Sequence, residues 1–253
     1  MTLALPWVGL ESVLLAGVRI AAFFVIAPPF SHRGVPGTVK VMLAMGLALL
    51  IAPRARAASD PTDVPAFVGQ LLLQVLIGLA LGFLVALVFA AVQSAGGLID
   101  LFAGFQLAQA YDPMGLFSGA QFARLYQLTA IVLLFASDGY QLVILGLVRT
   151  FDVLPLGMPL DLAAMAAVST AGFTQMFLAA LQVAGPLVVV LFLADVGLGL
   201  LTRVAPALNA FALGFPLKIL LTLMLSATAF LALPQLVAHL TGDAVTAIME
   251  VTR

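Results

Sequence analysis

The segment from Val64 to Ile99 contains no charged residue. A helix needs about 20 apolar residues to cross roughly 30 Å of hydrocarbon, so this segment can cross a bilayer with residues to spare. The rest of the chain is similar in character, since 64% of its 253 residues are hydrophobic and only 8% are charged. An ordinary soluble domain carries about 25% charged residues. The sequence therefore predicts an all-α protein with polytopic, membrane-type helices, or the obligate core of a larger assembly.

The charge balance and the absence of cysteine exclude several functions. Ten basic and eleven acidic residues give a formal net charge of -1, so the chain has no basic surface for nucleic acid. Without cysteine it can form no disulfide and no thiolate metal site. No Lys or Arg precedes Arg19, and Glu11 comes before it, so we expect no cleavable signal peptide.

Six further apolar segments accompany the charge-free one. They run over Trp7–Phe30, Val39–Ala52, Gln121–Ala136, Tyr140–Val148, Leu162–Leu201 and Phe215–Leu240. The segments around Asp138 are each short for a span, so they form either two helices or one bent helix. The loop near Pro155 divides a first part, 1–150, with several short helices, from a second part, 151–253, read as one long helical hairpin kinked at Pro186. A short polar tail is expected after Thr241, and the basic residues favour neither membrane orientation.

Small residues recur at every fourth position within the charge-free segment. They are Gly78, Gly82, Ala86, Ala90 and Ser94. This spacing is typical of a helix face that lets another helix approach closely. The alternative is that Gly and Ala are simply common in this chain, but five positions in register favour a packing face.

The stretch from Ala95 to Arg124 suits neither lipid nor water. Polar residues such as Asp112 are costly in hydrocarbon, and apolar residues such as Phe117 are costly in solvent. At its middle, Asp112-Pro113-Met114-Gly115 predicts a turn. Non-helical backbone at membrane depth persists only where protein buries it or where it lines a watery cavity. This stretch therefore either plugs a path or binds something in one.

The sequence offers no catalytic residues, no metal site and no cofactor site. The two histidines, His32 and His239, belong to no HExxH pair. Asp112 and Asp243 superficially suggest an intramembrane aspartyl protease, but Leu240 stands where that family requires glycine. Enzymatic function is therefore not expected.

Of the charged residues that lie within or beside apolar segments, we single out four as candidates for a function. They are Asp138, Asp195, Arg203 and Lys218. Such residues are functional candidates in a membrane, and a proton or ion relay is one possibility. The alternative, which we favour, is that they pair across helix interfaces or with neighbouring subunits.

Several short motifs lie along the chain at characteristic places. They are Gly97-Leu98-Ile99-Asp100, Asp112-Pro113, Asp138-Gly139-Tyr140, Leu154-Pro155-Leu156-Gly157, Arg203-Val204-Ala205-Pro206-Ala207-Leu208-Asn209 and Leu213-Gly214-Phe215-Pro216-Leu217-Lys218. Together they resemble the motifs of the FliR family, the R-type subunit of the flagellar type III export gate. The most specific residues are Arg203, Pro206, Asn209, Gly214, Pro216 and Lys218. The sequence departs from the family in lacking Gln directly after the Gly-Leu-Ile-Asp motif and in carrying Tyr140 where many members have His.

The resemblance implies a subunit that assembles with P-type and Q-type subunits, and with other membrane proteins of the export apparatus, in the bacterial inner membrane at the flagellar basal body. Unfolded flagellar proteins would pass through the assembled channel. In that family, the first part of the chain is similar to a P-type protomer and the second to a Q-type hairpin. No cofactor is implied.

The resemblance also implies that residues 104–119, here called the plug segment, help to close the channel. The side chains that would fill the constriction are Phe105, Leu107, Met114, Leu116 and Phe117, and the residues that would act as hinges are Gly104, Gly115 and Gly119. The remaining candidate residues of the segment are Gln106, Gln109, Asp112 and Pro113. Two rivals remain open: the injectisome export subunit of virulence secretion, and a secondary transporter with a helix broken at Asp112-Pro113. The transporter would fold alone and bind a small solute.

Overall fold

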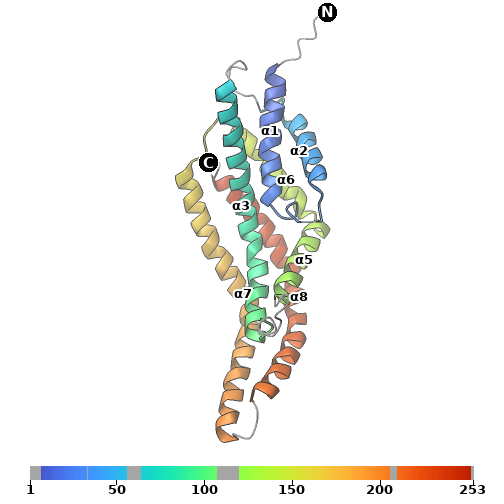
Figure 1. The fold of residues 1–253 in the computed structure, drawn as a ribbon, viewed down its shortest axis with the longest axis vertical. Helices are drawn as coiled ribbons and strands as arrows, with labels where there is room; N and C mark the ends of the chain where they lie inside the picture. Colours follow the sequence, from blue (N-terminus) through green and yellow to red (C-terminus); the bar gives the residue numbers. More distant parts are fainter. Residues whose placement is uncertain (1–6, 33, 56–63, 107–119, 206–209, 252–253) are drawn as a thin grey trace, which may run out of the picture. The chain divides into compact units, whose positions relative to one another are not determined.

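The computed structural model describes residues 7–32, 34–55, 64–106, 120–205 and 210–251, and every element over these residues is helical (Figure 1). The helices are α1 (Trp7–Ile26), α2 (Gly37–Ile51), α3 (Val64–Ala103), α5 (Gln121–Ala136), α6 (Gly139–Val153), α7 (Leu162–Val204) and α8 (Ala210–Val251). The all-α prediction is therefore confirmed. The charge-free segment forms most of α3.

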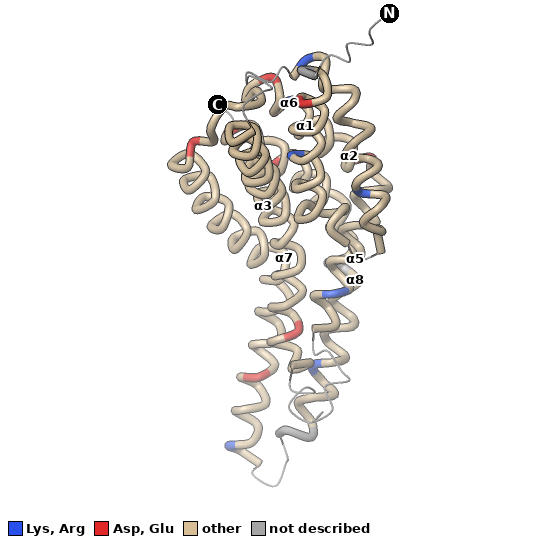
Figure 2. The backbone as a smooth tube through the Cα atoms, turned by 45° about the horizontal axis from the view of Figure 1, so that its top comes forward, with Lys and Arg blue, Asp and Glu red and all other residues tan. Residues whose placement is uncertain are grey.

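Over the described residues, four helical segments are long and apolar enough to cross a membrane: Gly9–Ile26, Val64–Ala103, Leu162–Val204 and Phe230–Val251. The pair α5 and α6 would add a fifth as one broken span, since the two helices meet at 78°. Helix α2 is shorter than a span, as the sequence predicts. Charged residues are sparse along all of these helices (Figure 2).

Asp138 forms the bend between α5 and α6. Its φ of 55° is left-handed, which L-residues other than glycine, asparagine and aspartate rarely adopt. Its carboxylate accepts a hydrogen bond from the Gln141 side chain at 3.0 Å. The sequence left open whether this region forms two helices or one bent helix, and the structure has two separate helices.

The expected polar tail after Thr241 is wrong, because α8 continues to Val251. Ala244, Ile248 and Val251 are all buried and recur at helical spacing. A β-carbon added at Gly146 of α6 would lie 3.7 Å from Ile248 and 3.5 Å from Val245. The tail is helical because this apolar stripe packs on α6.

The last helix begins earlier than the apolar segment Phe215–Leu240 indicates. Helix α8 begins at Ala210, so Pro216 falls in its second turn. Pro186 lies inside α7, which continues on both sides of it. Within the second unit described below, α7 and α8 run side by side as a hairpin (Figure 1).

The chain forms two compact units. Unit 1 comprises residues 1–88, 134–173 and 240–253, and unit 2 comprises residues 89–133 and 174–239. Phe23 and Phe24 of α1 are fully buried in unit 1. In unit 2, the fully buried Tyr126 lies between Phe122 and Phe230, with ring centroids 6.4 and 5.4 Å away. Each unit draws on separate parts of the chain. The division at residue 150 is a different one, between a part similar to P-type subunits and a part similar to Q-type subunits, and it stays a prediction.

Candidate functional site

The plug segment leaves α3 through a well-defined helix end. Gly104 follows the last helical residue with a φ of 83°, which glycine adopts without steric cost. The Gly104 N–H donates to the Leu101 carbonyl at 3.2 Å, and the Phe105 N–H donates to the Asp100 carbonyl at 3.1 Å. This pair of bonds is the Schellman motif, which satisfies carbonyls that the helix leaves free. The departure point of the plug segment is thus fixed by backbone geometry.

The plug segment is followed by α5, whose first turn is bound to the end of α3. The fully buried Asp100 carboxylate accepts hydrogen bonds from the backbone N–H groups of Phe122 and Ala123, each at 2.9 Å. These are the donors that a capping side chain at the start of a helix normally satisfies. Here the cap comes from another helix.

Gly96 makes this cap possible. A β-carbon at Gly96 would lie 2.6 Å from the Ala123 backbone and 2.6 Å from the Phe122 carbonyl oxygen. Gly96 and Asp100 are four residues apart, so they share one face of α3. The glycine lets α5 approach closely enough for the carboxylate to reach its N–H groups. Sequence reasoning missed this pairing, although two adjacent glycines before Asp100 were a signal for it.

The structure describes the first three residues of the plug segment. Gly104 is buried, and the half-buried Phe105 packs on α5, its ring centroid 5.6 Å from that of Phe122. Gln106 is exposed. The other candidates lie outside the described residues: Leu107, Gln109, Asp112, Pro113, Met114, Gly115, Leu116, Phe117 and Gly119.

The small residues of α3 begin their stripe in contact with α1. A β-carbon added at Gly78 would overlap the Arg19 carbonyl oxygen and lie 2.8 Å from the Ala22 β-carbon. One added at Gly82 would lie 2.9 Å from the Phe23 carbonyl oxygen. The later members, Ala86, Ala90 and Ser94, are half-buried. The first two glycines therefore let α1 and α3 meet at backbone distance.

A fully buried arginine connects three helices in unit 1. The Arg19 Nε donates to Gln74 Oε1 of α3 at 2.6 Å, and its Nη1 donates to the Leu154 carbonyl at the end of α6 at 2.9 Å. Its guanidinium lies over the Phe151 ring, 4.3 Å from the centroid. Cations are favoured at helix C-termini and over aromatic faces. The sequence placed Arg19 in an apolar helix but did not reveal these partners.

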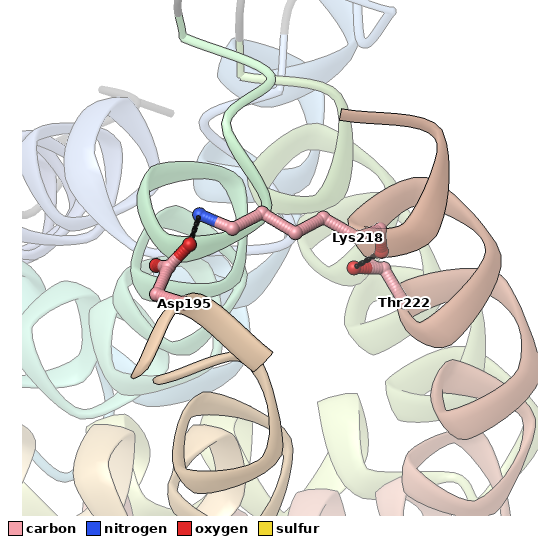
Figure 3. A network of polar contacts seen from close by, with 3 residues as sticks. All are labelled: Asp195, Lys218 and Thr222. Atoms are coloured by element: carbon pink, nitrogen blue, oxygen red, sulfur yellow. Dashed lines mark hydrogen bonds and ion pairs between the residues drawn. The ribbon is translucent and has the colours of Figure 1, made fainter. Parts of the chain in front are cut away.

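An ion pair joins the two helices of the hairpin in unit 2. Lys218 Nζ of α8 lies 2.6 Å from Asp195 Oδ1 of α7, and the Thr222 hydroxyl donates to the Lys218 carbonyl at 2.7 Å (Figure 3). For these two charges the structure has the interhelical pairing that we favoured over a relay. Arg203 is exposed in the last turn of α7.

Two of the remaining family-motif residues, Gly214 and Pro216, precede Lys218 on α8. Gly214 is buried, and a β-carbon there would lie 3.0 Å from Leu198 of α7. Pro216 is exposed. Pro206 and Asn209 lie outside the described residues.

Within the described part of the chain, no group of three or more His, Cys, Asp or Glu side chains could hold a metal ion. His32 accepts a hydrogen bond from the Gly34 backbone N–H at 3.1 Å in a turn. Among the described residues, Asp100, Arg19, Asp195 and Lys218 bind backbone groups or other side chains. Their arrangement positions helices.

Comparison with known proteins identifies the family. Residues 10–244 match the family described as bacterial export proteins, family 1. The chain is 36% identical to flagellar biosynthetic protein FliR of Escherichia coli (strain K12) over 231 residues, covering 89% of this chain and 87% of that protein. It is 33% identical to the FliR protein of Bacillus subtilis (strain 168) over 215 residues, 81% of each chain.

A relative from a different secretion system is also similar. Yop proteins translocation protein T of Yersinia pestis is 32% identical over 207 residues, covering 79% of this chain and 78% of that protein. The family model covers nearly the whole chain, and the FliR proteins align with both of its compact units. The chain belongs to family 1 of the bacterial export proteins, the FliR family, as its motifs predict.

Proposed function

We propose that this chain is a subunit of the flagellar type III protein export gate and forms part of the channel for unfolded flagellar proteins. The observation that carries the proposal is the match to FliR proteins across nearly the whole chain. Its role is structural: it binds, positions and seals. The chain is embedded in a membrane, and we place it in the bacterial inner membrane at the flagellar basal body.

The exposed apolar surface supports an assembled state. Leu162, Phe173, Phe177 and Leu231 are 78%, 51%, 57% and 82% exposed in the isolated chain. Apolar surface on this scale is covered by lipid or by other subunits. In our proposal, P-type and Q-type subunits and other export membrane proteins cover part of it. The first part of the chain, 1–150, takes a P-type place and the second, 151–253, a Q-type place.

The proposed task of the plug segment, 104–119, is to close the channel. Two features support this: the segment combines polar and apolar residues unsuited to lipid or solvent, and both of its flanks are fastened to Asp100. Phe105, Leu107, Met114, Leu116 and Phe117 fill the constriction, and Gly104, Gly115 and Gly119 allow movement. Opening then depends on rearrangement of the partners.

Copurification tests the assembly. The chain, tagged and expressed with its chromosomal neighbours, should elute from solubilised membranes together with P-type and Q-type subunits. A monodisperse monomer that binds a small solute would instead support the secondary transporter. If the copurifying proteins come from a virulence secretion system, the injectisome alternative replaces the flagellar assignment, as the similarity to the Yersinia protein allows.

Deletion of residues 106–119 tests the plug. Complexes that lack the segment and still contain all subunits should leak ions or small molecules through the membrane. A variant that replaces the same residues with an equally long Gly-Ser sequence controls for connection length. Unchanged conductance in correctly assembled complexes would remove the plug from the account.

A further inference from the structure

The position directly before α5 carries no capping side chain. Ala120 directly precedes its first residue, and alanine carries no hydrogen-bond acceptor in its side chain. Asp100 of α3 supplies the acceptors instead, one oxygen for the Phe122 N–H and the other for the Ala123 N–H, both at 2.9 Å. The start of α5 is thus attached to α3 by the same two bonds that cap it.

The other flank of the plug segment is attached to the same residue. The Asp100 carbonyl oxygen accepts the Phe105 N–H at 3.1 Å, and this bond completes the end of α3. Phe105 then packs on Phe122, one of the two residues whose N–H the carboxylate binds. One residue therefore contacts the chain where the plug segment leaves α3 and where α5 begins.

We propose that Asp100 is a positioning residue that holds the two ends of the plug segment together by tethering the first turn of α5 to the last turn of α3. This inference rests on the plug role proposed above. The tether keeps the start of α5 against the end of α3, so it fixes the two points between which the plug segment runs. Removal of the carboxylate should release the base while leaving the plug sequence intact.

A simpler reading is that Asp100 only caps α5. The two readings can be distinguished because a capping carboxylate can be placed on α5 itself, where it does not bind α5 to α3. Ala120 occupies the position from which a side chain normally reaches the second and third N–H groups of a helix. The double variant Asp100→Ala/Ala120→Asp therefore restores the cap from within the same helix. It does not restore the bond between α3 and α5.

The first measurement is the distance between spin labels at the base. The chain has no cysteine, so labels on Leu101→Cys and Leu125→Cys, which are 54% and 44% exposed, are the only ones on this subunit. In the copurified complex we expect one narrow distance distribution. Asp100→Ala should broaden it and lengthen its mean, and the added Ala120→Asp should not reverse this. Asp152→Ala, at an exposed carboxylate of α6, is the control.

Two outcomes would overturn the positioning role. One is an unchanged distribution in Asp100→Ala, and the other is full recovery by Ala120→Asp, which leaves only a cap. If Asp100→Ala fails to assemble, Asp100→Asn decides the matter: it keeps one acceptor oxygen and loses the other. We expect Asp100→Asn to broaden the distance distribution, but less than a side chain with no acceptor oxygen would. An unchanged distribution again overturns the proposal.

The second measurement is ion leak through assembled complexes, with the 106–119 deletion as reference. Asp100→Ala should raise the leak above the wild-type level, without rescue by Ala120→Asp. If the deletion leaks and Asp100→Ala does not, the tether is not needed for closure and this inference fails while the plug stands. If the deletion does not leak, the plug fails, and the label distances alone decide whether Asp100 positions α5.

Discussion

The most informative perturbation of the fold is Arg19→Met. Methionine keeps an unbranched apolar side chain of similar length, but it donates no hydrogen bond. The substitution leaves two buried acceptors without their donors, Gln74 Oε1 and the Leu154 carbonyl, which Arg19 contacts at 2.6 and 2.9 Å. It also removes the cation over the Phe151 ring. Three helices lose their common contact.

The expected cost follows from these contacts. Each buried acceptor left unpaired costs about 1–3 kcal/mol. A desolvated cation–π contact adds about 2 kcal/mol. Removing a buried charge recovers part of its desolvation penalty. We therefore expect a net loss of roughly 3 kcal/mol, which corresponds to a fall in apparent Tm of about 6–12 °C for a chain of this size.

The partner substitution Gln74→Leu provides the matched control. Alone, it removes the acceptor of the Arg19 Nε and should also destabilise. In the double variant Arg19→Met/Gln74→Leu neither partner is left unpaired on that side, so the loss should be smaller than the sum of the two single losses. The assay is the fraction of copurified complex that survives heating, followed by size-exclusion chromatography. Wild-type stability in Arg19→Met, or strictly additive losses in the double variant, would refute the reasoning.

Three further predictions concern close contacts of the chain. Gly96→Val should destabilise the complex by about 1–3 kcal/mol, because the new side chain meets backbone atoms of α5. Gly97→Ala should be neutral or stabilising, because nothing lies within 4 Å of its added β-carbon. Equal melting temperatures of the two variants would contradict this. Asp138→Gly should preserve the bend and Asp138→Val should cost about 1–2 kcal/mol, since φ is 55° there, and the reverse order of thermal stability would count against a left-handed bend. The ion pair of Lys218 with the 46% exposed Asp195 should contribute about 1 kcal/mol or less to the stability of the chain. Lys218→Met should therefore lower the apparent Tm by about 4 °C at most. A larger fall would mean that a partner covers the pair.

The sequence was most informative where the signal is local. The charge-free segment predicted α3, and the small-residue spacing drew attention to Gly78 and Gly82, which lie against α1. Both depend on the composition of one segment. The break near Asp138 was also visible, although its helical alternatives could be separated only by the backbone conformation of that residue.

Contacts between distant segments could not be predicted. The cap on α5 depends on Asp100, more than 20 residues away in the sequence, and on the absence of a β-carbon at Gly96. Arg19 finds its partners on α3 and at the end of α6, at separations of 55 and 135 residues. The helical end of α8 was missed because its apolar residues are few, and they become an interface only when Gly146 of α6 lies opposite. Local sequence patterns therefore predict the helices, whereas the site is formed by contacts between helices that are distant in the sequence.

The central claim is that this chain lines the path of exported proteins and closes it with the plug segment. A photo-activated cross-linker at Met114 or Phe105, in cells in which a flagellar substrate is arrested during export, tests it most directly. The account predicts adducts between this chain and the arrested substrate, and none when no substrate is engaged. Normal export without adducts from either position would contradict it.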